Sequence, residues 1–174
     1  IVTLVVTHGT RVFAHRSGNA FVAVKEDGSV ITWGESRYCR IPDEVKDGLA
    51  ACVVDVACTD SAFAAVKDTG SVITWGAAHS GGNSHCVKAE LASGVTRVVG
   101  TDCAFAAVKE GGSVITWGDD HCGGNSNKNK AELASGVVRV VGNGCAFAAV
   151  KENGSVITWG SLAEGGNWDE VKEE

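Results

Sequence analysis

The stretch AFAAVKEGGSVITWG, from Ala104 to Gly118, decides the fold because it occurs in four versions along the chain. Nearly identical copies begin at Ala20, Ala62 and Ala146, so the spacing is a constant 42 residues. Periods of roughly 20 to 50 residues are typical of stacked or circular repeat architectures. The sequence therefore predicts a repeat protein in which each copy is one structural unit.

Each copy contains two short β-favouring runs around a polar glycine turn, such as Lys109–Gly112. This pattern predicts a β-hairpin, with glycine at the turn because a Cβ disfavours left-handed backbone. We expect a further strand before each hairpin, at Arg11–Ala14, Val53–Ala57, Arg97–Gly100 and Arg139–Gly142. A glycine-rich fourth element follows each Trp-Gly, and helical turns are expected at Ala89–Ala92 and Ala131–Ala134.

The run SVITWG carries apolar side chains on both faces, because alternate residues of a strand point to opposite sides. A sheet that is apolar on both faces needs a neighbour on each, and radial blades supply this arrangement. We expect the repeated tryptophans to hold the blades together: Trp33, Trp75, Trp117 and Trp159.

The predicted fold class is all-β, a β-propeller-like array of four antiparallel blades with three or four strands each. Short helical turns connect the blades, and the array is either a partial arc or a small closed ring. Residues 1–174 form a single repeat domain, with repeat cores at approximately 11–52, 53–94, 95–136 and 137–174.

The charge and composition exclude two classes of partner. The net charge of the 174 residues is −6 and there is no basic run, so we expect no nucleic-acid binding. No apolar stretch reaches the ~20 residues that span a bilayer.

Because the chain contains no methionine and Val171 falls where Val87 falls in an earlier copy, we expect a processed product or part of a longer protein.

The seven cysteines exchange with small residues between copies. Cys103 and Cys145 share a repeat position with Ser61, and Cys122 shares one with Ser80. This exchange is typical of a compact apolar filler, so we predict free thiols and a reducing intracellular compartment such as cytosol, nucleus or plastid stroma.

The repeated string, with its small-aliphatic strand, glycine turn and aromatic strand ending in Trp-Gly, resembles the repeat of the regulator of chromosome condensation (RCC1) family. The short period resembles the compact repeats of a secreted bacterial β-lactamase inhibitor and of many microalgal proteins more than it resembles the longer eukaryotic form of the repeat. Family propellers usually have seven blades, so further blades outside this chain are a third possibility. The first copy departs from the pattern, because Arg37–Pro42 replaces the glycine-rich loop.

Several residues could act in catalysis or bind a metal ion, but their spacing does not match a familiar catalytic or metal-binding motif. Asp119–Cys122 and His79 hold metal-ligating side chains near His85 and Cys86, but no Cys-x-x-Cys pair or paired histidines at helical spacing accompany them. Each recurring serine lies beside a turn glycine and is interpreted as a turn residue, and no glycine-flanked nucleophile elbow is present, so we predict no enzyme activity and no cofactor. A metal-binding module is kept as an alternative.

The copies differ most in the segment after Trp-Gly. In a repeat scaffold, the residues that hold the fold recur in every copy, whereas the exposed residues that bind partners vary. The candidate partner-binding residues there are Arg37, Tyr38, Arg40, Asp119, Asp120, His121, Leu162, Glu164 and Trp168, with Asn127 and Lys128 on the same stretch. Trp168 is either an anchor for a partner or a cap on the last blade.

We therefore predict a noncatalytic protein-interaction or scaffold module, a subunit or segment of a larger assembly whose partners are other protein subunits. The microalgal resemblance suggests a peripheral position on an algal membrane complex. The alternative that the RCC1 resemblance implies is a regulator of an enzyme, either a small-GTPase exchange factor or an enzyme inhibitor.

Overall fold

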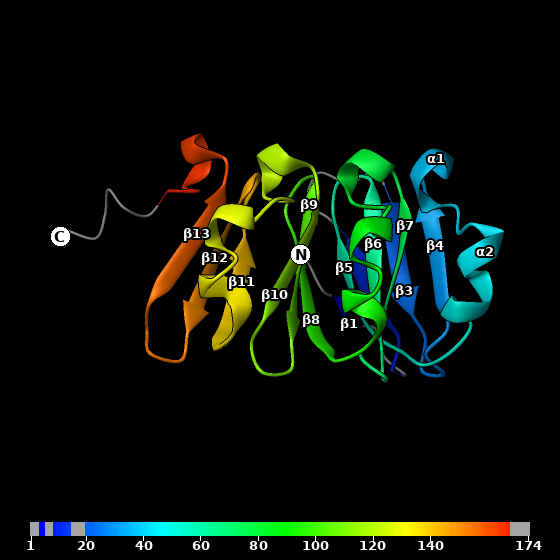
Figure 1. The fold of residues 1–174 in the computed structure, drawn as a ribbon. Coiled ribbons are helices and arrows are strands. Elements are labelled where there is room, and N and C mark those ends of the chain that lie inside the picture. Colours follow the sequence, from blue (N-terminus) through cyan, green and yellow to red (C-terminus); the bar gives the residue numbers. More distant parts are fainter. Residues whose placement is uncertain (1–3, 6–8, 15–19, 168–174) are drawn as a thin grey trace.

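The computed structural model describes residues 4–5, 9–14 and 20–167, and there the chain is mainly β-strand (Figure 1). The strands are β1 (Leu4–Val5), β2 (Arg11–Ala14), β3 (Ala20–Val24), β4 (Val30–Gly34), β5 (Val53–Cys58), β6 (Ala62–Lys67), β7 (Val72–Gly76), β8 (Val95–Gly100), β9 (Ala104–Lys109), β10 (Val114–Gly118), β11 (Val137–Gly142), β12 (Ala146–Lys151) and β13 (Val156–Gly160). The short helices are α1 (Ser36–Cys39), α2 (Asp43–Lys46), η1 (Asp47–Leu49), η2 (Ala78–Ser80), η3 (His85–Val87), η4 (Glu90–Ala92), η5 (Asp120–Cys122), η6 (Asn127–Asn129), η7 (Glu132–Ala134) and η8 (Leu162–Glu164).

These strands form four antiparallel sheets, which we call blade 1 (β1 to β4), blade 2 (β5 to β7), blade 3 (β8 to β10) and blade 4 (β11 to β13). Every predicted hairpin is confirmed, and each places a tryptophan opposite a phenylalanine, as in the Phe105–Trp117 pair of β9 and β10. Each predicted third strand pairs with the first strand of its hairpin.

The fourth element of each copy differs from a strand. In the described residues, the segment after Trp-Gly begins as a short helix in every copy, and in the last three copies a glycine with positive φ ends that helix, as Gly123 does. Within the part of the chain that the structure describes, only blade 1 has a fourth strand, and this is β1, which pairs with β2 on the opposite edge of the sheet.

The blades stand side by side in chain order and form an open arc (Figure 1). The strand that precedes each hairpin contacts its equivalent in the next blade, from β2 through β5 and β8 to β11. Blades 1 and 4 lie at opposite ends of the row, so the alternative of a small closed ring is wrong. The successive rotations of four blades do not bring the last blade round to the first.

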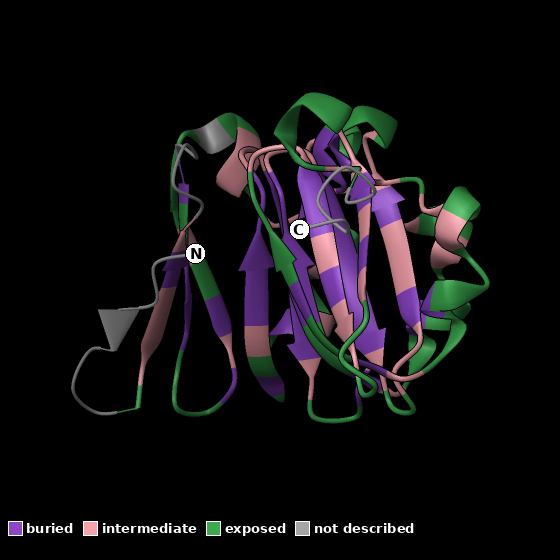
Figure 2. Cartoon of the chain, turned by 90° about the vertical axis from the view of Figure 1, so that its left-hand side faces the viewer, coloured by how far each residue is buried: buried purple, intermediate pink, exposed green. Residues whose placement is uncertain are grey.

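The hydrophobic core consists of three clusters, one at each junction between neighbouring blades. One side of each junction carries small side chains, such as Ala64 and Val66 of blade 2. The other side carries the aromatic pair of the next blade, such as Phe105 and Trp117, whose rings stack with centroids 5.3 Å apart. Strand interiors are accordingly buried, while the turns at both rims are exposed (Figure 2).

The predicted role of the tryptophans is confirmed for three of the four. Trp75, Trp117 and Trp159 are 1%, 5% and 3% exposed. Trp33 is 42% exposed, because no blade precedes blade 1 in the described structure. The prediction that Trp33 also holds two blades together is therefore wrong within this arc.

Each later junction seats its aromatic pair on a glycine of the preceding blade. A Cβ added to Gly123 would lie 2.6 Å from Cδ2 of Phe147, so only glycine fits beneath that ring. The indole N–H of Trp159 donates to the Gly123 carbonyl at 3.0 Å, and Trp117 donates to Gly81 in the same way at 2.9 Å. The repeated Gly-Gly-Asn segment is thus a receptor for the next blade as well as a turn.

Candidate partner-binding rim

The residues that vary between copies lie along one edge of the arc. Each blade's last strand ends there, and a short helix follows: α1, η2, η5 and η8 (Figure 1). We call these four helices the upper rim. The hairpin turns with Lys67 and its equivalents lie on the opposite edge, so the array separates its variable turns from its repeated turns.

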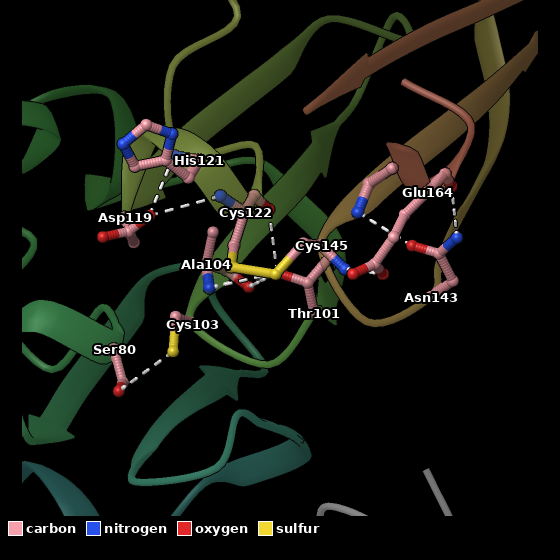
Figure 3. The surroundings of a disulfide bond; sticks show 11 residues. Ser80, Thr101, Cys103, Ala104, Asp119, His121, Cys122, Asn143, Cys145 and Glu164 are labelled. Carbon is pink, nitrogen blue, oxygen red and sulfur yellow. Dashed lines mark hydrogen bonds between the residues drawn. A yellow bond between two sulfur atoms is a disulfide. The ribbon is translucent and has the colours of Figure 1, made fainter. Parts of the chain in front are cut away.

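Two of the predicted partner-binding residues are engaged in local structure. The carboxylate of Asp119 caps η5, because it accepts hydrogen bonds from the backbone N–H of His121 at 2.8 Å and of Cys122 at 3.3 Å. Glu164 accepts a hydrogen bond from the backbone N–H of Cys145 at 2.8 Å (Figure 3). Both side chains therefore help to hold the rim in shape.

Five of the remaining rim candidates face solvent. Arg37, Arg40, Asp120 and His121 are exposed, and Leu162 is 76% exposed, which is unusual for a large apolar side chain. The exposed Asn127 and Lys128 lie on η6, away from the upper rim.

Tyr38 is half-buried, and the Arg37 guanidinium lies 5.6 Å from its ring centroid. The contact keeps one cation close to the end of blade 1. Trp168 lies outside the described residues, so its role as anchor or cap stays a prediction.

A disulfide joins Cys122 of blade 3 to Cys145 of blade 4 beneath this rim (Figure 3). The interpretation of these two cysteines as apolar filler is wrong. Each aligns with a serine in an earlier copy, and the alignment of copies does not reveal that the two positions face each other across a junction. At the preceding junction the same positions hold Ser80 and Cys103, with Oγ and Sγ 3.7 Å apart.

The other cysteines are free thiols, and Cys58 fits the filler interpretation. It is fully buried at the junction of blades 1 and 2, and burial raises the pKa of its thiol to about 12. Burial also raises the pKa of Cys103. Because a thiol with a raised pKa is protonated at neutral pH, neither is an activated nucleophile. The reducing compartment stays a prediction.

A pair of hydrogen bonds from one polar side chain recurs beside the rim in blades 2, 3 and 4, and it was not predicted from the sequence. The Thr101 hydroxyl accepts from the Ala104 N–H at 3.1 Å and donates to the Cys122 carbonyl at 2.9 Å. Thr59 makes the same pair of contacts in blade 2. In blade 4, Asn143 replaces the threonine and uses its amide oxygen and nitrogen for the two bonds. The recurrence of Thr at one repeat position was the signal available in the sequence.

The predicted metal-ligating residues do not converge. In the residues that the structure describes, no group of three or more His, Cys, Asp or Glu side chains is placed to hold a metal ion. Asp119 and Cys122 already have the partners given above. A shallow groove of about 300 Å³ runs between the connection after blade 2 and blade 3, and two candidates, Asp120 and Asn127, line it.

No helix in the described part of the chain combines the length and the apolar character needed to cross a membrane. No family model matches the chain, and no curated protein matches it in sequence.

Solved structures do match it. Yeast RCC1 (Prp20), solved bound to Kap60, has a TM-score of 0.60 and 15% identity over 83% of this chain and 42% of that one. Human WBSCR16 has a TM-score of 0.53 and 17% identity over 84% of this chain and 46% of that one. The ectodomain of the Arabidopsis thaliana receptor kinase ACR4 has a TM-score of 0.54 and 18% identity over 82% of this chain and 46% of that one.

At these identities the comparison establishes the fold alone. This chain spans less than half the length of each of these three structures. The four sheets, one four-stranded and three three-stranded, correspond to blades of those propellers, which confirms the resemblance seen in the repeated string. In fold, the described chain is an open run of four RCC1-type propeller blades.

Proposed function

We propose that the chain is a noncatalytic protein-interaction module, a subunit or segment of a larger assembly, and that the upper rim is its contact surface. The observation that carries this proposal is the separation of repeated and variable residues. Junctions and hairpins repeat almost unchanged, whereas α1, η5 and η8 present different exposed side chains on one rim. Repeat proteins present their binding residues in this way on a constant scaffold.

The matched structures support a protein partner. One structure of the yeast protein Prp20p describes its binding to Gsp1p and histones, and another contains Kap60. The same fold therefore binds proteins in other chains, although fold alone assigns no partner.

The chemistry of the rim indicates what a partner would offer. Blade 1 presents Arg37 and Arg40, blade 3 presents Asp120 and His121, and blade 4 presents Leu162. A partner lying along the rim would place acidic groups opposite blade 1 and an apolar pocket opposite Leu162. We expect Leu162 to contribute most to affinity, because exposed charges at a rim contribute little.

The experiment compares two quadruple variants in extract of the source cells. The rim variant replaces Arg37, Asp120, His121 and Leu162 with serine. The control replaces four exposed acidic residues of the hairpin turns with serine: Glu26, Asp68, Glu110 and Glu152. We expect the natural chain and the control to retain the same protein partner, and the rim variant to lose it while unfolding at the same temperature. Loss in the control, or retention by the rim variant, would refute the proposal.

Two finer proposals follow from the resemblance. One places the chain on the periphery of an algal membrane complex inside the cell, and the identity of the captured partner decides it. The other is regulation of an enzyme as an exchange factor or inhibitor. Nucleotide-release and inhibition assays on the captured partner would separate a regulator from a scaffold.

A further inference from the structure

The two ends of the arc are the two halves of one junction. At the start, Phe21 and Trp33 stack with centroids 5.4 Å apart, as in every other blade. Their equivalents are at most 5% exposed, whereas Phe21 is 44% and Trp33 42% exposed. Ile31 beside them is 44% exposed. Blade 1 therefore presents a complete aromatic pair with no blade to receive it in the described structure.

The other end presents an empty receptor. Gly165 has the same backbone angle as Gly123, with φ +91° in both, but a Cβ at Gly165 would meet nothing within 4 Å. Val141 of β11 is 45% exposed, whereas its equivalents Val99 and Ala57 are 8% and 1% exposed. A hollow of about 130 Å³ lies here, lined by Val141, Ala148 and Gly165 among others.

We propose that a second copy of this chain occupies this receptor, head to tail, with its Phe21–Trp33 pair seated on Gly165. The partner copy's indole N–H would donate to the Gly165 carbonyl, as Trp159 donates to Gly123 within the chain. The proposed contact continues an established interface, because the same contact already occurs between blades of the chain and each copy exposes both of its halves. This surface lies on the end faces of blades 1 and 4 and adjoins the upper rim at Glu164, which lines the hollow, so the inference goes beyond the proposed function.

The stoichiometry follows from the geometry of such contacts. A head-to-tail interface is heterologous, and it closes into a ring or continues as a filament. Two copies contribute eight blades, which lies within the range of roughly four to eight blades in known propellers. Three copies would contribute more blades than that range allows. We therefore expect a closed dimer with two identical junctions.

The test measures the mass of the 174-residue chain in solution by sedimentation velocity over a dilution series. The expected species is a dimer, twice the 17.9 kDa of one chain. Two single variants, Val141→Glu and Trp33→Ser, each remove one half of the junction. Each should weaken the dimer by about 30-fold or more, the effect of losing an interface hot spot.

The matched control is Val138→Glu. Val138 lies on the same strand as Val141 and is 59% exposed, but its equivalent Val54 is exposed at an internal position too, so it belongs to no junction. This variant should remain dimeric. Each variant exchanges an exposed side chain, so circular dichroism should show an unchanged fold.

Mixing the two disrupted variants distinguishes head-to-tail docking from a symmetric contact. The Val141→Glu copy still offers an intact aromatic pair, and the Trp33→Ser copy still offers an intact receptor. The mixture should therefore form dimers that neither variant forms alone. A chain that is monomeric at every concentration, or a dimer that both variants leave intact, would overturn the proposal. Open polymers would overturn the closed ring.

Discussion

The junction between blades 1 and 2 differs from the two later junctions in one buried group. Trp117 and Trp159 donate their indole protons to Gly81 and Gly123 of the preceding blade. Trp75 is as deeply buried, but its indole nitrogen has no hydrogen-bond partner. In the first copy Cys39, the last residue of α1, stands where Gly81 and Gly123 stand in later copies, and its carbonyl accepts a hydrogen bond from the Thr32 hydroxyl instead.

This difference shows that burial and polar pairing are separable in a repeat. The aromatic stack, the small facing side chains and the apolar cluster are all present at the first junction. Only the acceptor is missing. A buried donor without a partner costs about 1–3 kcal/mol, so the first junction should be the weakest of the three.

The largest expected effect comes from placing a methyl group in a filled receptor. Gly123→Ala would put Cβ 2.6 Å from Phe147 and would hold a left-handed backbone angle. Overpacking and backbone strain together should lower the free energy of unfolding by about 4 kcal/mol. Denaturant unfolding measures this loss.

Gly165→Ala is the matched control, because it has the same backbone angle and empty space around it. It should cost only the backbone strain, about 1–2 kcal/mol, when measured at low protein concentration. Equal losses in the two variants would show that Gly123 does not seat the next blade.

The next effect concerns the cross-link, which is present at only one junction among the described residues. Cys122→Ser makes the junction of blades 3 and 4 chemically like that of blades 2 and 3, where Ser80 faces Cys103. Removing a disulfide across 23 residues should lower stability by about 3 kcal/mol in non-reducing buffer.

A reducing agent should abolish the difference between natural chain and Cys122→Ser, since it breaks the same bond. Cys103→Ser should change stability little in either buffer. If the intact mass of the natural chain did not rise by two protons on reduction, the cross-link would be absent in solution.

A smaller effect is expected from the indole hydrogen bonds. Trp117→Phe removes a bond and leaves the Gly81 carbonyl without its donor, whereas Trp75→Phe removes a donor that has no acceptor. The loss of packing is similar in both. Trp117→Phe should therefore destabilise the chain by about 1–2 kcal/mol more than Trp75→Phe, as measured by thermal unfolding. A larger loss at Trp75 would reverse the comparison of junctions.

The smallest effect is a pH dependence that arises from Asp55 in β5. Burial raises the pKa of Asp55 in β5, although the Val56 N–H and the charges of Arg11 and Arg97 act in the opposite direction. Because the folded pKa exceeds the unfolded value of about 3.9, this group's contribution is full below pH 4 and is lost as the pH rises through the folded pKa. Asp55→Asn should flatten this part of the stability profile. An unchanged profile would contradict a raised pKa.

The repeat made the fold predictable from the sequence. Identical strings at one spacing specify hairpins, blades and buried tryptophans such as Trp117 without knowledge of distant contacts. What the sequence did not reveal depends on how neighbouring copies meet. The pairing of Cys122 with Cys145 depends on which positions face each other across a junction between blades. Trp33 is exposed and Trp117 is buried although both lie in the same repeated string, because Trp33 belongs to the first blade of the arc.

The candidate rim was predictable only in part. Variation between copies located α1, η5 and η8, and the structure places them on one edge. Variation between copies could not distinguish Asp119 and Glu164, which accept hydrogen bonds from nearby backbone, from Asp120 and Leu162, which face solvent. That distinction needs the conformation of the turn itself.

Exchange of the indole protons, followed by NMR, tests most directly whether each blade is held by seating its tryptophan on the preceding glycine turn. The structure predicts slow exchange at Trp117 and Trp159, with faster exchange at Trp75 despite its burial. Exchange at Trp117 and Trp159 as fast as that of a free indole would contradict the account.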